Sequence, residues 1–77
     1  MDVNLHGKNL YQARIAVRSA LMRATAADYR IRIIHGYRGG TAIRDMVREE
    51  FSVHPRVIRV ENSLNPGETV LVLREYI

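Results

Sequence analysis

Residues 29–44 read YRIRIIHGYRGGTAIR, and this stretch decides the fold. Residues 29–35 alternate between apolar and basic side chains, with one extra isoleucine, which predicts a half-buried strand. Residues 36–40 predict a glycine-rich loop. Apolar side chains then recur at helical spacing, which predicts a helix from about Thr41 to Phe51 or Ser52. A strand, a loop and a helix in this order are typical of α/β units with parallel strands.

The N-terminal part of the chain repeats this order of elements. Residues 1–5 alternate and predict a short strand. Asn9 and Gln12 have the spacing of a capping box, which marks the start of a helix. Apolar residues at helical spacing then extend this helix over residues 10–26 or 10–27.

The C-terminal part of the chain predicts two further strands. Pro55 ends the second helix, because proline cannot continue a helix. The β-branched residues within 56–61 predict a third strand. Residues 62–67 have turn chemistry, and residues 69–76 predict the fourth strand. Residues 70–73 are apolar on both faces, which favours an interior position in the sheet.

The predicted order is therefore β-α-β-α-β-β, an α/β two-layer sandwich. Two right-handed crossovers make the first three strands parallel and place both helices on one face of the sheet. The last two strands form a long hairpin, so the fourth strand is antiparallel. Its interior position gives a mixed four-stranded sheet in the order 1-2-4-3. The other sheet face is expected to be open unless a partner covers it.

Length and composition describe one globular domain over residues 1–77. The 77 residues leave no room for two domains, and 47% hydrophobic content excludes a disordered chain. The absence of cysteine excludes a disulfide framework, a thiolate metal site and a cysteine nucleophile. No apolar run approaches the length of a membrane span, and residues 1–5 do not resemble a signal peptide. We therefore expect a cytoplasmic protein without a membrane partner.

The charge balance favours an anionic partner. Twelve basic residues face eight acidic ones, giving a net charge of +4, and Lys8 is the only lysine among the twelve. The planar guanidinium of arginine pairs bidentately with phosphate. DNA or RNA is therefore the expected partner. A coding bias that prefers arginine to lysine is the alternative explanation.

Two His-Gly pairs follow the first two predicted strands. His6-Gly7 and His35-Gly36 both stand at the C-terminal ends of parallel strands, where α/β proteins bind ligands. We expect the two histidines to lie near one another. Such a pair suits proton transfer near neutral pH. The alternative is that each histidine only forms a hydrogen bond to a loop carbonyl.

The glycine-rich loop leads directly into a helix, which is a favourable arrangement for binding phosphate. Glycines let backbone N–H groups approach a ligand, and the helix N-terminus adds unsatisfied donors and a positive dipole end. The stretch matches neither the Walker loop nor the dinucleotide fingerprint, and a merely flexible loop is the alternative. The predicted phosphate-binding residues are Arg38, Gly39, Gly40, Thr41, Arg44, Lys8 and Asn4, and the predicted catalytic residues are His6 and His35.

The open sheet face is a second basic candidate surface. Arg30 and Arg32 alternate with isoleucines and should lie on this face, and Arg59 and Arg74 extend it. This face is predicted either to bind a phosphate backbone or a partner protein, or to be simply solvated. The acidic residues are scattered, so we expect no metal site and no cofactor; Mg²⁺ is possible but not indicated.

The two His-Gly motifs resemble those of the small MutS-related (Smr) domain family over nearly the whole chain. Residues 3–7, VNLHG, match the family's Leu-Asp-x-His-Gly motif. Residues 33–44 match its strand ending in Ile-Ile-His-Gly, its Gly-x-Gly loop and the following helix start. Residues 54–57, HPRV, look like its entry to the third strand. The resemblance implies the fold of the C-terminal domain of translation initiation factor three and binding of DNA or RNA, in several members with endonuclease activity.

Two departures from the family pattern bear on the activity. Asn4 stands at the family aspartate and cannot act as a general base or an anionic ligand. Thr41 stands at the second loop glycine and does not adopt positive φ cheaply. Three functions remain open: an endonuclease with His6 and His35 as base and acid, a nucleic-acid-binding module without catalysis, and a protein-interaction module. The last would use the open sheet face in a homodimer or within a larger host protein.

Overall fold

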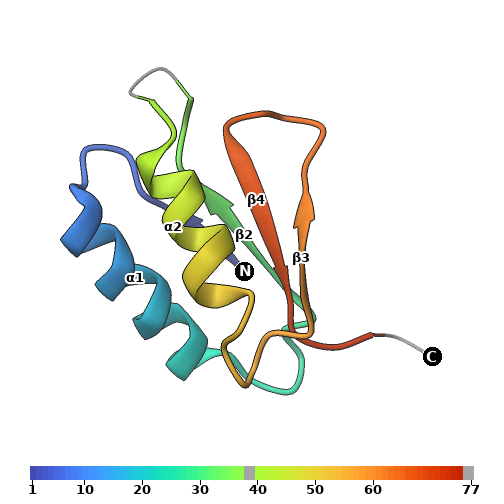
Figure 1. Cartoon of the computed structure of the whole chain (residues 1–77). Helices are drawn as coiled ribbons and strands as arrows, with labels where there is room; N and C mark the ends of the chain where they lie inside the picture. Colours follow the sequence, from blue (N-terminus) through green and yellow to red (C-terminus); the bar gives the residue numbers. More distant parts are fainter. Residues whose placement is uncertain (38–39, 76–77) are drawn as a thin grey trace.

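The computed structural model describes residues 1–37 and 40–75, and Figure 1 shows two helices packed on one side of a four-stranded sheet. The sheet order is β1-β2-β4-β3, with β1 parallel to β2 and β4 antiparallel to both of its neighbours. The predicted fold class, strand order and strand directions are thereby confirmed. The elements are β1 (Asp2–Asn4), α1 (Leu10–Arg23), β2 (Arg30–Ile34), α2 (Ala42–Phe51), β3 (Arg59–Asn62) and β4 (Glu68–Val72).

The core lies between the helices and the sheet. Alternate residues of β2 turn toward the helices, so Ile31 and Ile33 are fully buried while Arg30 and Arg32 are exposed. Leu71 of β4 stands opposite Ile31 and joins the same layer. The helices cover this layer with buried residues at helical spacing, which are Ala13, Val17, Ala20, Leu21, Met46, Val47 and Phe51.

Helix α1 begins as predicted and ends earlier. Asn9 Oδ1 accepts the Gln12 backbone N–H at 2.8 Å, and Gln12 Oε1 accepts the Asn9 N–H at 3.0 Å, so the capping box is confirmed. The helix was expected to reach residue 26 or 27 but ends at Arg23. The carboxylate of Asp28 accepts the Thr25 N–H at 2.8 Å, and this local turn competes with further helical hydrogen bonds.

The two C-terminal strands are shorter than predicted. The third strand, expected over residues 56–61, begins only at Arg59, because a turn uses the backbone N–H groups before it: Val57 donates to the His54 carbonyl at 2.9 Å and Arg56 donates to the His54 ring at 3.1 Å. The Arg56 guanidinium donates hydrogen bonds to the Leu21 and Ala24 carbonyls at the end of α1. The fourth strand, expected over residues 69–76, is Glu68–Val72, and Tyr76 lies outside the described residues. Bounds of the other elements differ from the predictions by one residue or two.

A bidentate ion pair joins the two helices. Arg14 of α1 donates from Nε and Nη2 to the two carboxylate oxygens of Glu50 in α2, at 2.7 and 2.8 Å. These hydrogen bonds, with the charge of Arg14, hold the pKa of Glu50 below its usual range, and they raise the pKa of Arg14. The pair therefore favours the charged carboxylate and the packed arrangement of the helices.

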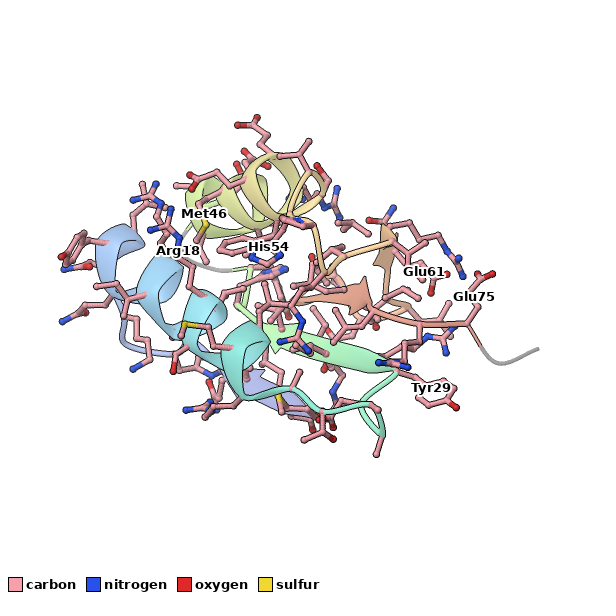
Figure 2. The ribbon with its side chains drawn as sticks, turned by 90° about the horizontal axis from the view of Figure 1, so that it is seen from below. Arg18, Tyr29, Met46, His54, Glu61 and Glu75 are labelled. Atoms are coloured by element: carbon pink, nitrogen blue, oxygen red, sulfur yellow. The ribbon has the colours of Figure 1, made fainter. Side chains whose placement is uncertain are left out.

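The open sheet face carries a network of ion pairs. Arg32 contacts Asp2 at 2.7 Å and Glu68 at 3.8 Å, and these carboxylates raise the pKa of Arg32. Arg30 lies 3.8 Å from Glu61. Arg59 contacts both Glu61 and Glu75, and Figure 2 shows these two glutamates together on the side of the sheet away from α1. Three arginines therefore meet four carboxylates on this face, which favours the solvated alternative over binding of a phosphate backbone.

No helix within residues 1–37 and 40–75 combines the length and the apolar character that crossing a bilayer requires.

Candidate functional site

Three loops meet at one end of the sheet, at the top of Figure 1: the β1–α1 loop, the β2–α2 loop and the β3–β4 loop. The Leu5 N–H donates to the Ile34 carbonyl at 2.9 Å, which aligns the ends of β1 and β2. The backbone N–H groups of His35 and Gly36 both donate to the Gly67 carbonyl at 2.9 Å. The loops are thus tied together by backbone hydrogen bonds, and both His-Gly pairs lie at this end as predicted.

Asn4 fixes the ring of His6. The Asn4 Oδ1 atom accepts the His6 backbone N–H at 2.9 Å and lies 2.7 Å from the His6 Nδ1 atom. Since a carbonyl oxygen is only an acceptor, this pattern assigns the proton of the neutral ring to Nδ1. The Nε2 atom then carries the lone pair. A side-chain Cβ placed on Gly36 would stand 3.6 Å from this Nε2 atom, so the ring lies against the Gly36 backbone.

His35 has a different environment. Its Nδ1 atom lies 2.7 Å from the Gly36 carbonyl oxygen, and its Nε2 atom lies 2.8 Å from the hydroxyl of Thr69, which is fully buried. The carbonyl accepts from Nδ1–H, so Nε2 accepts the Thr69 hydroxyl proton. Both ring nitrogens are thus used within the protein. In this arrangement the His35 ring orients the Gly36 carbonyl and is not open to a ligand.

The start of α2 offers backbone donors and one competing carboxylate. Gly40 has a φ of 95°, and Thr41 follows as the N-cap residue with a φ of −115°, so the glycine and not the threonine takes the left-handed conformation. The Thr41 hydroxyl makes no cap hydrogen bond and instead donates to Asp45 Oδ2 at 3.0 Å. Arg44 Nε lies 3.4 Å from Asp45 Oδ1. Asp45 therefore partly neutralises both the helix N-terminus and Arg44.

The remaining predicted phosphate-binding residues divide into two groups. Lys8 is exposed beside His6, and its N–H closes the turn by donating to the Leu5 carbonyl at 3.1 Å. Its ammonium group has no ion-pair partner among residues 1–37 and 40–75. Arg38 and Gly39 lie outside the described residues. In the described part of the chain, no three His, Cys, Asp or Glu side chains are grouped as metal ligands.

The sequence interpretation missed three residues that build this site. Thr69 had a signal, because period-two alternation puts it with Leu71 on the buried face, where a hydroxyl needs a partner. Gly67 had only its turn chemistry, although a Cβ there would stand 3.2 Å from the Gly36 Cα atom. Tyr37 was treated only as a loop residue and is 61% exposed at the edge of the site.

Comparisons with known proteins agree with this architecture. The sequence profile of the Smr domain family matches residues 3–71. Among solved structures, the crystal structure of the Smr domain of Thermus thermophilus MutS2 matches with a TM-score of 0.86 and 30% sequence identity, over 96% of this chain and 98% of that one. A comparison with curated proteins found no match. The chain belongs to the Smr domain family, which is associated with nucleic-acid binding and nuclease activity.

Proposed function

We propose that this Smr domain binds DNA or RNA through phosphate at the end of the sheet where the three loops meet. One observation carries the proposal: the exposed His6 ring, with its Nε2 lone pair set by Asn4, lies against Gly36. The donors at the start of α2 and the ammonium group of Lys8 belong to the neighbouring loops. A phosphate between these groups would accept hydrogen bonds from backbone and side chains together.

The distribution of charge disfavours the open sheet face as the binding surface. On the open face, three arginines are matched by four carboxylates. The chain as a whole carries a net charge of +4, so its excess positive charge belongs to the helices and loops. Nucleic acid is therefore attracted more to the rest of the surface than to the open sheet face, and at the three loops the exposed ammonium group of Lys8 has no ion-pair partner within residues 1–37 and 40–75.

We propose further that His6 is the acid–base group if the bound nucleic acid is cleaved. On RNA, the His6 Nε2 atom would take the proton of a 2′-hydroxyl as its oxygen attacks the adjacent phosphorus. The bond to the 5′-oxygen then breaks, and water protonates that leaving oxygen. His35 serves in this scheme as a positioning residue, because its ring orients the Gly36 backbone and exposes no nitrogen.

Binding without cleavage is the second candidate function, and two observations favour it. Asn4 supplies no negative charge to stabilise a protonated His6 ring. His35 offers no second proton donor, because Gly36 and Thr69 occupy both of its nitrogens. A domain with this site would still attract phosphate, and its affinity would still fall with salt as counterions are released.

A cleavage assay with matched variants separates the two candidates. Supercoiled plasmid and a structured RNA would be incubated with the wild-type chain, with His6→Ala and with His54→Ala, each with and without Mg²⁺. His54 lies in the connection between α2 and β3, which Figure 1 shows at the opposite end of the sheet from the three loops, so it controls for loss of a histidine. Cutting that survives in His54→Ala and falls by roughly 10²- to 10⁴-fold in His6→Ala supports His6 as the base.

Binding of the same substrates is measured in parallel by fluorescence anisotropy at rising salt. Affinity that falls steeply with salt, without any cutting, leaves the binding module as the function. Affinity that stays flat between low and high salt contradicts both candidates, because phosphate binding must release counterions.

A further inference from the structure

Tyr37 places an aromatic ring at the edge of the proposed phosphate site. It follows His35 and Gly36 directly and is 61% exposed, although a tyrosine ring gains by leaving water. A single exposed apolar residue needs no explanation by itself. The position of this one matters, because aromatic rings beside a phosphate groove are the platforms on which proteins stack the bases of single strands.

The β3–β4 loop braces the ring of Tyr37. Gly67 is buried, and a Cβ on Gly67 would stand 3.2 Å from the Tyr37 Cδ1 atom and 3.3 Å from Asn65 Oδ1. The ring therefore packs against the Gly67 backbone, and any side chain at position 67 would crowd it. The same glycine carbonyl accepts the N–H groups of His35 and Gly36. Gly67 is thus held by hydrogen bonds at the end of β2, next to the proposed site. Because the Tyr37 ring already packs against Gly67, it loses little conformational entropy when it stacks on a ligand.

Gly36 connects the ring with the proposed phosphate contact. Its backbone lies against the His6 Nε2 atom on one side and against the Tyr37–Gly67 contact on the other. A nucleotide whose phosphate contacts His6 and the Gly36 backbone therefore brings its own base, or the next one, to Tyr37. In a continuous duplex both faces of every base are covered by neighbouring bases, so only an unpaired or displaced base can stack on a protein ring.

We propose that Tyr37 is a stacking platform that selects nucleic acid with an unpaired base beside the bound phosphate. This inference rests on the proposed function and narrows its substrate class to single strands and to duplexes interrupted by an unpaired nucleotide. Stacking uses the ring and not the hydroxyl, so phenylalanine replaces tyrosine at this position without loss. An aliphatic side chain of similar size has no aromatic ring, so it cannot replace tyrosine without loss of stacking.

The chain contains no tryptophan, so a Tyr37→Trp variant carries a single fluorescent reporter at the site. Its emission would be followed while a short single strand, a duplex, and the same duplex with one unpaired nucleotide are added, as both DNA and RNA. The single strand and the interrupted duplex are expected to quench the emission, because an indole stacked on a base loses fluorescence. The continuous duplex is expected to leave the emission unchanged.

Affinities of the wild type, Tyr37→Phe and Tyr37→Leu for these probes are measured separately by anisotropy of labelled nucleic acid. The leucine variant should lose roughly tenfold in affinity for the single strand and nothing for the duplex, while the phenylalanine variant keeps wild-type affinities. If the wild type and both variants bind each probe with equal affinity, the stacking proposal is overturned and the proposed function stands. If the wild type binds none of the probes at low salt, the proposed function itself is wrong.

Discussion

The Asn4 side chain accepts two hydrogen bonds from the same histidine, one from the His6 backbone N–H and one from the ring Nδ1 atom. The amide oxygen thereby orients His6 as a carboxylate oxygen could, but it carries no negative charge. It sets the tautomer of the neutral ring and directs the Nε2 lone pair toward Gly36. Asn4, which stands at the family aspartate, therefore orients His6 without adding a negative charge beside it.

Replacing Asn4 by alanine should release the His6 ring while leaving the residue itself in place. We expect any His6-dependent cleavage to fall to a level between those of the wild type and His6→Ala, because a free ring samples both tautomers and several orientations. Asn4→Asp is the matched variant, since it keeps the acceptor oxygen. Its carboxylate can still accept the hydrogen bond from the His6 ring, so His6-dependent cleavage should not fall as it does in Asn4→Ala. Equal rates in wild type and Asn4→Ala would contradict a positioning role.

Thr69 is expected to stabilise the fold through His35. Thr69→Val keeps the shape of the side chain but removes the hydroxyl that donates to His35 Nε2 at 2.8 Å. A partly buried acceptor without a donor costs about 1–3 kcal/mol, so urea unfolding should show a loss of that size. Thr41→Val removes an exposed hydroxyl from the same end of the molecule and should cost less. A Thr69→Val variant as stable as the wild type would mean that the hydrogen bond contributes nothing.

The sequence predicted the elements whose signals are local. The spacing of Asn9 and Gln12 fixes the start of α1, and the alternation around Ile31 and Ile33 fixes which face of β2 is buried. Strand order followed as well, because a strand that is apolar on both faces belongs inside a sheet. Each of these inferences depends only on the pattern of residues that are close together in the sequence.

The contacts that distinguish the two histidines depend on distant segments. His6 and His35 follow equivalent strands in the sequence, yet β1 is an edge strand and β2 has β4 beside it. Only His35 therefore meets a strand on its second side, and the antiparallel register brings Thr69 to its ring. Arg56 shows the same limit, because its backbone N–H donates to the His54 ring in a turn where local β-propensity predicted the start of a strand, and its guanidinium reaches the distant end of α1.

The Arg14–Glu50 pair should make stability depend on pH. Hydrogen bonds from Arg14 lower the pKa of Glu50 in the folded chain, so the stabilisation is complete above the usual glutamate value of 4.5 and is lost as the pH falls through the lowered value. Glu50→Gln should therefore be less stable than the wild type near neutral pH, and the difference should vanish in acid. The midpoints of urea unfolding for the wild type and Glu50→Gln, near neutral pH and in acid, measure this difference in stability.

Glu49→Gln is the control for that experiment, because it removes the same charge from the adjacent exposed position of α2. Its side chain has no ion pair among residues 1–37 and 40–75, so the control should follow the wild type at both pH values. A Glu50→Gln difference that persists unchanged in acid would show that the effect comes from lost packing and not from the ion pair.

Asp45 should weaken the binding of nucleic acid. Its carboxylate accepts the Thr41 hydroxyl at 3.0 Å and lies 3.4 Å from Arg44 Nε, so it competes with phosphate for the two side chains nearest the start of α2. Asp45→Asn should raise affinity for a labelled oligonucleotide at low salt, and the gain should shrink as salt screens the charges. Glu49→Gln changes the net charge equally at the other end of the helix. A gain of the same size in both variants would assign the effect to net charge, whereas a gain confined to Asp45→Asn places the phosphate at the start of α2.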